Sequence, residues 1–450
     1  MPGSPETLCQ NRRVAFHAID AGALARWLAQ LAEQAGDQVD LFLERREEAE
    51  LPGDERRPGV ALVREQGMAV RLVRQGRSYL GSADTIDGRT FADTVRRVAR
   101  ALPRTALPEP ELAEPAWDEP VQVSELATFA ESVREALRAR LVAFPLRLRV
   151  RRHRRWVQVL GPQLLSPPEA EAFYSVVGET PWGRRGRLLA DLAPGAAAEL
   201  AEGLSELFRA RTAPAPPRAR LPVVLAPHAS AVFLHEAVAH ALEADLLALG
   251  GHPEAAIGFE LAGSGLSLLD DPGAGPEPVR RTTDDEGMPV LRRWLLRSGR
   301  VEQPLADGLW ARACPRLLPG SGWRGSRHAL PMPRCRHLEV VPGEVSPASL
   351  WRRAEGGLVI SDVDRGALDP HTGWITLEAS AARRVRDGAP AEPVGRCRLR
   401  GRVADLLSAV AGVAHDLEEG GAGWCAKGGQ RLPVWARSCS LLLGEVEVTP

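Results

Sequence analysis

The chain has 450 residues, of which 44% are hydrophobic and 26% are charged, and its formal net charge is −1. This is the composition of an ordinary globular protein, and the length favours two domains over one core. The near-zero net charge excludes a general attraction to nucleic acid or an anionic membrane, and no apolar run reaches membrane-spanning length.

The cysteines and the N-terminal residues predict a compartment. The N-terminal sequence MPGSPETLCQNRRVAF lacks the apolar stretch of a secretory signal, and the six cysteines show no C-x-x-C spacing. Scattered thiols are typical of a reducing environment, so we predict a cytoplasmic protein. The chain also has a single lysine, Lys427, among 57 basic residues, which suggests that arginine will not serve at that position.

Residues 1–215 are predicted to form an N-terminal α/β domain. Apolar residues recur at helical spacing in 20–36, 87–101, 123–142 and 189–211, and they alternate as in strands in 39–51, 60–84 and 146–156. We predict turns or bulges at Gly67, Gly76 and Gly81. A Pro-rich excursion occupies 102–120, and the stretch APAPPRARLP at 213–222 indicates a domain boundary.

Residues 216–450 are predicted to form a larger, mainly antiparallel β domain, so the fold class is α+β. The stretch VVLAP reads as a buried strand that leads into a helix containing two histidines. A Gly- and Pro-rich loop follows at 262–289, and from residue 290 short apolar runs alternate with turn signals. One helix, 402–413, is expected among these strands.

The first motif that carries chemistry is FLHEAVAHALEAD, residues 233–245. His235 and His240 are five positions apart, which places them roughly 140° apart on an ideal α-helix, too far round to share one metal ion. Either a π-bulge must bring the histidines to one side, or the helix must begin inside the motif. The alternative is an amphipathic helix on which Glu236, His240 and Glu243 share a polar face by chance.

The second motif is GGAGWCAKGGQ, residues 420–430. Cys425 lies among glycines on what we expect to be exposed, tightly turning backbone, and the ammonium group of Lys427 could favour its thiolate or hold an anionic substrate group. The alternative is a glycine-rich hairpin with an incidental buried cysteine. The third ligand of a metal site could be Glu243 or a distant cysteine; Cys335 has no assigned role, and His228 reads as a loop residue.

Taken together, the two motifs resemble those of the TldD/PmbA family of metalloproteases. HEAVAHALEAD is similar to the family's H-E-x-x-x-H helix, and GWCAKGGQRLPV is similar to its C-terminal Cys-Gly-Lys-x-Gly-Gln segment. Further similar stretches are EQGMAVRLVRQGRSYLGSAD, DDEGMPV at 284–290 and GLVISDVDRGALDPHTGWITLEA at 357–379, so the resemblance covers nearly the whole chain.

The resemblance implies a zinc-dependent peptidase that cleaves unfolded or leader-type peptides. His235, His240 and Cys425 match the metal ligands, and Glu236 matches the catalytic acid/base that assists attack of zinc-bound water on the peptide bond. The family also implies a homodimer, or a heterodimer with a related subunit. The alternative is a non-catalytic scaffold subunit of such a heteromeric protease complex.

A different class of function, nucleic-acid binding, would rest on the arginine-rich stretch RLRVRRHRRW at 147–156. A solvated strand face in an arginine-rich protein explains that stretch equally well. The near-neutral charge and the 5% aromatic content favour the solvated strand, so we expect neither a nucleic-acid nor a membrane partner.

Overall fold

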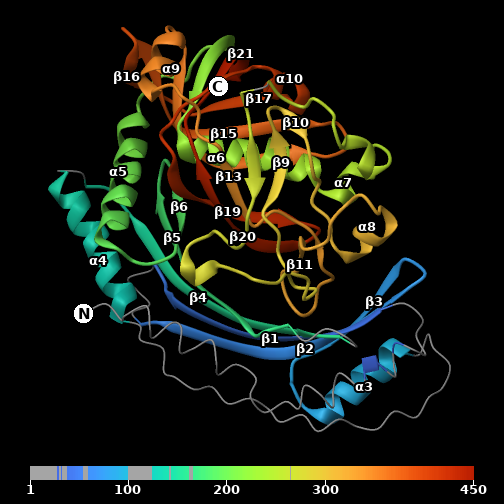
Figure 1. Cartoon of the computed structure of the whole chain (residues 1–450). Helices are drawn as coiled ribbons and strands as arrows, with labels where there is room; N and C mark the ends of the chain where they lie inside the picture. The colour runs from blue at the N-terminus through green and yellow to red at the C-terminus, as the bar shows by residue number, and fades with distance from the viewer. Residues whose placement is uncertain are drawn as a thin grey trace.

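The computed structural model describes residues 28–29, 32, 38–53, 59–99, 124–140, 143–161, 166–263 and 265–450. These residues form a mixed α+β fold in which strands predominate. A curved sheet built from the N-terminal half lies below a β-rich C-terminal half, with α4 and α5 at one side and α3 beneath the sheet (Figure 1).

The N-terminal sheet has six strands in the order β3-β2-β1-β4-β5-β6, and every pairing is antiparallel. The prediction of an α/β domain is therefore wrong in its sheet type, because an α/β domain has parallel strands joined by helical crossovers, whereas all these pairings are antiparallel. The elements are β1 Gln38–Leu51, β2 Ala61–Arg74, β3 Arg77–Ala83, α3 Gly88–Ala99, α4 Ser124–Ala139, β4 Arg147–Leu160, β5 Glu169–Thr180, β6 Gly183–Leu189 and α5 Pro194–Ala210.

Strand β1, at the centre of the N-terminal sheet, is buried on both faces, with apolar side chains on one face and mainly charged side chains on the other. Along β1, Val39, Leu41 and Leu43 pack with α3 residues in one apolar cluster. The alternating residues Asp40 and Glu44 point to the other face and are also buried. The strand therefore has the period expected from its sequence, but its polar face meets the C-terminal half and not water.

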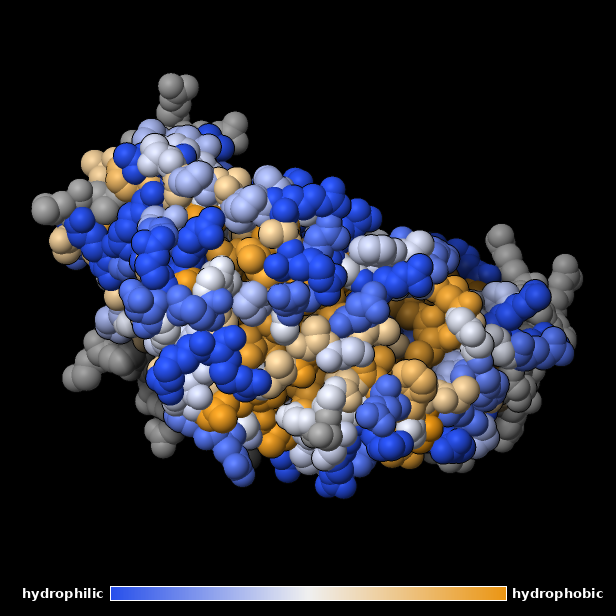
Figure 2. Space-filling model, turned by 90° about the horizontal axis from the view of Figure 1, so that it is seen from above, coloured by the Kyte–Doolittle hydropathy of each residue, from blue (hydrophilic) through white to orange (hydrophobic). Residues whose placement is uncertain are grey.

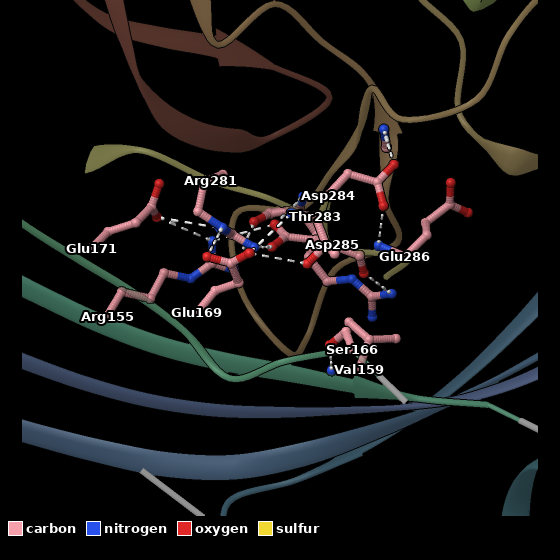
Figure 3. Close-up of polar contacts among 12 residues, drawn as sticks. Arg155, Val159, Ser166, Glu169, Glu171, Arg281, Thr283, Asp284, Asp285 and Glu286 are labelled. Atoms are coloured by element: carbon pink, nitrogen blue, oxygen red, sulfur yellow. Dashed lines mark hydrogen bonds and ion pairs between the residues drawn. The ribbon is translucent and has the colours of Figure 1, made fainter. Parts of the chain in front are cut away.

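The buried charges form an ionic layer between the two halves (Figure 3). The Arg155 guanidinium on β4 donates to Glu44 at 2.9 Å and to Asp285 of the C-terminal half at 3.2 Å. Arg281 contacts Asp285 at 3.1 Å and Glu171 on β5 at 3.5 Å. Arg155, Arg281, Glu44, Glu171 and Asp285 thus each have an opposite charge beside them, which offsets the cost of their burial.

The C-terminal half contains two larger sheets, ordered β14-β7-β21-β17-β15-β16 and β10-β9-β8-β13-β20-β19, with β18 on β21. β14 also pairs with β15, which closes five strands into a ring. Among the pairings between named strands in the described residues, only β14–β7 and β13–β20 are parallel. The elements are β7 Ala219–Leu225, α6 Pro227–Leu234, α7 Ala244–Leu247, β8 Leu268–Asp270, β9 Arg293–Arg297, β10 Arg300–Val301, α8 Gly308–Ala313, β11 Gly322–Trp323, β12 Met332–Pro333, β13 His337–Val340, α9 Pro347–Arg353, β14 Leu358–Asp369, β15 Trp374–Arg386, β16 Ala389–Val394, β17 Cys397–Arg402, α10 Val403–Ser408, β18 Val410–Val413, β19 Glu418–Lys427, β20 Gln430–Ser438 and β21 Leu441–Thr449.

Three local predictions differ from the structure. The predicted helix 402–413 ends at Ser408, because Val410–Val413 pairs with β21 as a strand. Gly76 is a turn residue with φ 71°, but Gly67 and Gly81 lie inside strands. A Cβ at Gly67 would lie 2.5 Å from Arg327 Nε, so close packing and not a turn requires that glycine.

Two predicted segments, the helix 20–36 and the Pro-rich excursion 102–120, fall wholly or almost wholly outside the described residues. Within the described part of the chain, no helix has the length and apolar character needed to cross a bilayer. The face of the C-terminal half seen in Figure 2 carries apolar residues along its middle, between hydrophilic margins.

Candidate metal centre

Helix α6 carries the first histidine into the core of the C-terminal half. Pro227 occupies its first turn, where a missing N–H costs nothing, and its residues from Ala229 to Leu234 are all buried. A helix that is apolar on every side is stable only inside a core, and α6 runs through the middle of this half (Figure 1).

The chain then adds one residue to a helical turn. His235–Ala239 is π-helical, and the backbone N–H of His240 donates to the carbonyl of His235 instead of to a residue four positions back. The two imidazoles therefore lie on the same side of the helix, with ring centroids 4.6 Å apart. Of the two alternatives that the five-residue spacing allows, a π-bulge or a helix that begins inside the motif, the structure has the π-bulge.

Cys425 reaches the histidines from strand β19, where it pairs with Leu432 of β20. Its Sγ lies 3.3 Å from His240 Nε2, and one ligand atom from each of His235, His240 and Cys425 lies within 4.8 Å of the others. The expected exposed turn is wrong, because Cys425 is 7% exposed and lies within the strand. The tight turn, at Gly428 and Gly429, follows the strand.

The three side chains fit a divalent metal ion. Neither ring nitrogen of buried His235 has a hydrogen-bond partner among the described residues. A buried imidazole without a partner is costly, and a metal ion would remove that cost. Two imidazoles and one thiolate form a ligand set suited to zinc that leaves a fourth position open.

The charges around the cluster favour the thiolate. Burial raises the pKa of Cys425, but His235 and His240 beside it hold the pKa well below its ordinary value. Arg334, which is 1% exposed, donates from Nη2 to Cys425 Sγ at 2.9 Å and to the carbonyl of the same residue at 2.8 Å. This charge-assisted hydrogen bond fixes the rotamer of the Cys425 side chain. It could not be predicted from the sequence, since no local pattern pairs residue 334 with residue 425.

Glu243 holds His240 from behind. Its Oε2 lies 2.9 Å from His240 Nδ1, which leaves Nε2 directed at Cys425. A carboxylate on the far nitrogen of a ligating histidine is the usual way to fix the tautomer. Glu243 is therefore a partner of His240, and it is absent from the His-His-Cys cluster in the described structure.

Lys427 forms an ion pair with the Glu243 carboxylate. We had expected its ammonium group to lie beside the Cys425 thiolate, but its hydrogen bonds and ion pairs go to other groups. Its Nζ lies 2.9 Å from Glu243, 2.7 Å from Asp245 and 2.9 Å from the carbonyl of Pro333. Burial raises the pKa of Glu243, but His240 and Lys427 lower it to about 2. An ammonium group has three hydrogens for these three acceptors, whereas the planar fork of arginine does not match them.

Glu236 lines a cavity of about 760 Å³ together with His235, His240 and Cys425. Its Oε2 accepts a hydrogen bond from the backbone N–H of Leu368 on β14 at 3.1 Å. Gly366 on the same strand allows the close approach, because a Cβ there would lie 2.7 Å from Glu236 Cγ. The carboxylate is thus held beside the two histidines and faces the cavity.

Two other residues named from the sequence lie apart from the cluster. Cys335 Sγ donates to Asp270 at 3.2 Å, and burial with the nearby Asp270 raises the pKa of its thiol. His228 is the second residue of α6 and lies 3.2 Å from Asp362, so it is a helix residue on the cavity wall and not a loop residue.

Comparisons with known proteins show similarity to metallopeptidases. Residues 218–450 match the family described as PmbA/TldA metallopeptidase C-terminal domain. A metalloprotease of Methanothermobacter thermautotrophicus is 31% identical over 223 residues, which are 49% of this chain and 48% of that protein. The TldD homologue of Buchnera aphidicola, also named a metalloprotease, is 29% identical over 238 residues, 52% of this chain and 48% of that protein.

The chain therefore spans about half the length of the curated relatives it matches. The crystal structure of TldE from Thermococcus kodakarensis superposes with a TM-score of 0.70 at 16% identity, over 96% of this chain and 100% of that chain. This likeness shows that the fold is shared over both halves of the molecule.

Proposed function

The chain belongs to the PmbA/TldD metallopeptidase family, and we propose that it is a zinc-dependent peptidase that cleaves unfolded or leader-type peptides. His235, His240 and Cys425 hold the metal ion, and Glu236 is the catalytic acid/base. The single observation that carries the proposal is the meeting of these three ligand atoms within 4.8 Å beside an open cavity.

Each residue has a task that follows from its contacts. When bound, zinc supplies Lewis acidity toward a peptide carbonyl and lowers the pKa of a water molecule. Glu236 takes a proton from the attacking water and delivers it to the leaving amine, while the Leu368 N–H holds the other carboxylate oxygen in place. Glu243 keeps His240 in one tautomer, and Arg334 keeps the Cys425 sulfur in one position.

The test compares metal content with cleavage. Glu236→Gln should retain about one zinc per chain by elemental analysis and lose cleavage of an unstructured peptide, whereas His240→Ala and Cys425→Ala should lose both. Cleavage by Glu236→Gln at the wild-type rate would contradict the acid/base role. If that cleavage came from a partner subunit and not from this chain, the result would favour the alternative of a non-catalytic scaffold subunit. Sedimentation of the purified chain, alone and with a related subunit, tests the expected dimer.

A further inference from the structure

Three arginines from three different strands line the cavity that contains the metal centre. Arg184 lies on β6, Arg365 on β14 and Arg431 on β20, and all three side chains are exposed. Among the described residues none of them has an ion pair with a carboxylate; Arg431 only stacks on Trp424, with its Cζ 5.1 Å from the ring centroid. The cavity therefore presents three guanidinium groups that the chain does not neutralise.

The carboxylates of the same cavity wall are already engaged. Asp362 pairs with Arg187 at 2.6 Å and also with Arg185, Asp364 pairs with Arg396 at 2.8 Å, and Glu236 accepts from Leu368. None of these three carboxylates forms an ion pair with Arg184, Arg365 or Arg431. A concave wall with unneutralised guanidinium groups attracts anions and binds carboxylates through charge-assisted hydrogen bonds.

A high arginine content does not by itself leave arginines without carboxylate partners. Strand β4 has six arginines, and every one of them lies within 4.0 Å of a glutamate oxygen on β1, α4 or β5. Each arginine of the run at 147–156 thus has a glutamate of this chain beside it, some at the surface and some buried. The cavity is a place where this matching fails.

Two of the three arginines neighbour, along or across a strand, residues that lie beside the metal centre. Arg431 pairs across the hairpin with Ala426, the neighbour of Cys425. Arg365 directly precedes Gly366, which packs against Glu236. All three arginines line the same cavity as Glu236 and Cys425, so a carboxylate bound there would belong to a substrate that reaches the metal centre.

We propose that this cavity selects peptides that carry carboxylates beside the scissile bond, with Arg184, Arg365 and Arg431 as the specificity-determining residues. The proposal rests on the proposed peptidase function and names its substrate class. The carboxylate has two possible sources, an Asp or Glu side chain and the free C-terminus of a short peptide, and the arms of the test separate them.

The cleavage test uses matched quenched fluorescent peptides. One pair differs only in Glu or Gln on both sides of the scissile bond, and each peptide is made with a free and an amidated C-terminus. We expect kcat/KM about tenfold higher for the Glu peptide, or for the free-acid form if the C-terminus is the source. Arg365→Glu with Arg431→Glu should invert the ratio, and Arg89→Gln, which removes an exposed arginine on α3 away from the cavity, should leave it unchanged.

Binding is measured separately, by fluorescence anisotropy with the Glu236→Gln protein, so that specificity and catalysis can fail independently. Equal cleavage of all four peptides, with equal binding, would overturn the specificity proposal and leave the peptidase function intact. Tight, arginine-dependent binding of the acidic peptide by a protein that cleaves no peptide would support the specificity proposal and overturn the peptidase function.

Discussion

Substitutions in the ion pair Glu243–Lys427 should affect folding stability and metal affinity to different extents. Glu243 is fully buried, and its two charged or polar contacts are His240 Nδ1 and Lys427 Nζ, each at 2.9 Å from Oε2. Lys427 has two further acceptors, Asp245 at 2.7 Å and the Pro333 carbonyl at 2.9 Å. Substitution of Glu243 and substitution of Lys427 should therefore have different consequences.

Glu243→Gln leaves Lys427 with its other partners but removes the carboxylate that orients His240. Loss of such a partner lowers metal affinity about 10- to 100-fold, or about 1.4–2.7 kcal/mol. Lys427→Met leaves the Glu243 carboxylate buried with His240 alone, and stranding a buried charge costs about 3–5 kcal/mol of folding stability. The double variant should be more stable than Lys427→Met, because residue 243 then carries no buried charge.

Zinc affinity is measured by competition with a chromogenic chelator, and unfolding free energy by guanidinium denaturation of the metal-free protein. Wild-type zinc affinity in Glu243→Gln would show that Glu243 does not orient His240. A double variant with the summed destabilisation of the two single variants would show that the buried ion pair does not couple the residues.

Three further predictions concern other contacts of the structure. Gly366→Ala should lower kcat more than it changes KM, since the new Cβ would lie 2.7 Å from Glu236 Cγ; unchanged kcat would mean that β14 does not position the carboxylate. Arg334→Met should shift the thiolate-to-metal charge-transfer band of the cobalt-loaded protein to lower energy, since the Cys425 sulfur loses a 2.9 Å charge-assisted bond; an unmoved band would refute this. Burial and nearby Glu286 raise the pKa of Asp307 to about 7, so the folded state holds a proton that the unfolded chain releases above about pH 4, and stability should fall as pH rises from about 4 to 7. Asp307→Asn, which preserves the helix cap, should remove that slope in denaturation measured across the pH range; a wild-type slope in this variant would contradict the assignment.

Local patterns predicted the strands and helices well wherever neighbours in sequence decide the structure. Alternation gave β1 and β4, and the turn at Gly76 is where the sequence indicates one. Alternation alone would place the polar face of β1 in solvent. That face is buried, because the partners of Asp40 and Glu44 include Arg324 and Arg327, more than 280 residues away. Long-range charge matching leaves no periodic signal in the sequence.

At the metal centre, too, some features could be predicted from local sequence and others depend on long-range contacts. The five-residue spacing correctly indicated that His235 and His240 need a distorted helix, and the π-helical turn supplies it. The burial of Cys425, the approach of Arg334 and the direction of Lys427 depend on how β19 packs against α6 and β12. None of these contacts could be read from local composition, which suggested an exposed cysteine with a lysine beside it.

The location of these contacts explains why the site joins distant parts of the chain. The histidines lie on a helix inside the core, whereas Cys425, Lys427 and Arg431 all lie on the hairpin β19–β20, whose outer strand is at the edge of its sheet. An ion held by both elements would bond a core helix to an edge hairpin across 185 residues of sequence. Because a ligand that binds only the folded state stabilises it, metal binding would also fix the hairpin that carries Arg431 into the cavity. Metal loading and recognition of a carboxylate at Arg431 would then favour each other, since each binding event needs the hairpin in the same position.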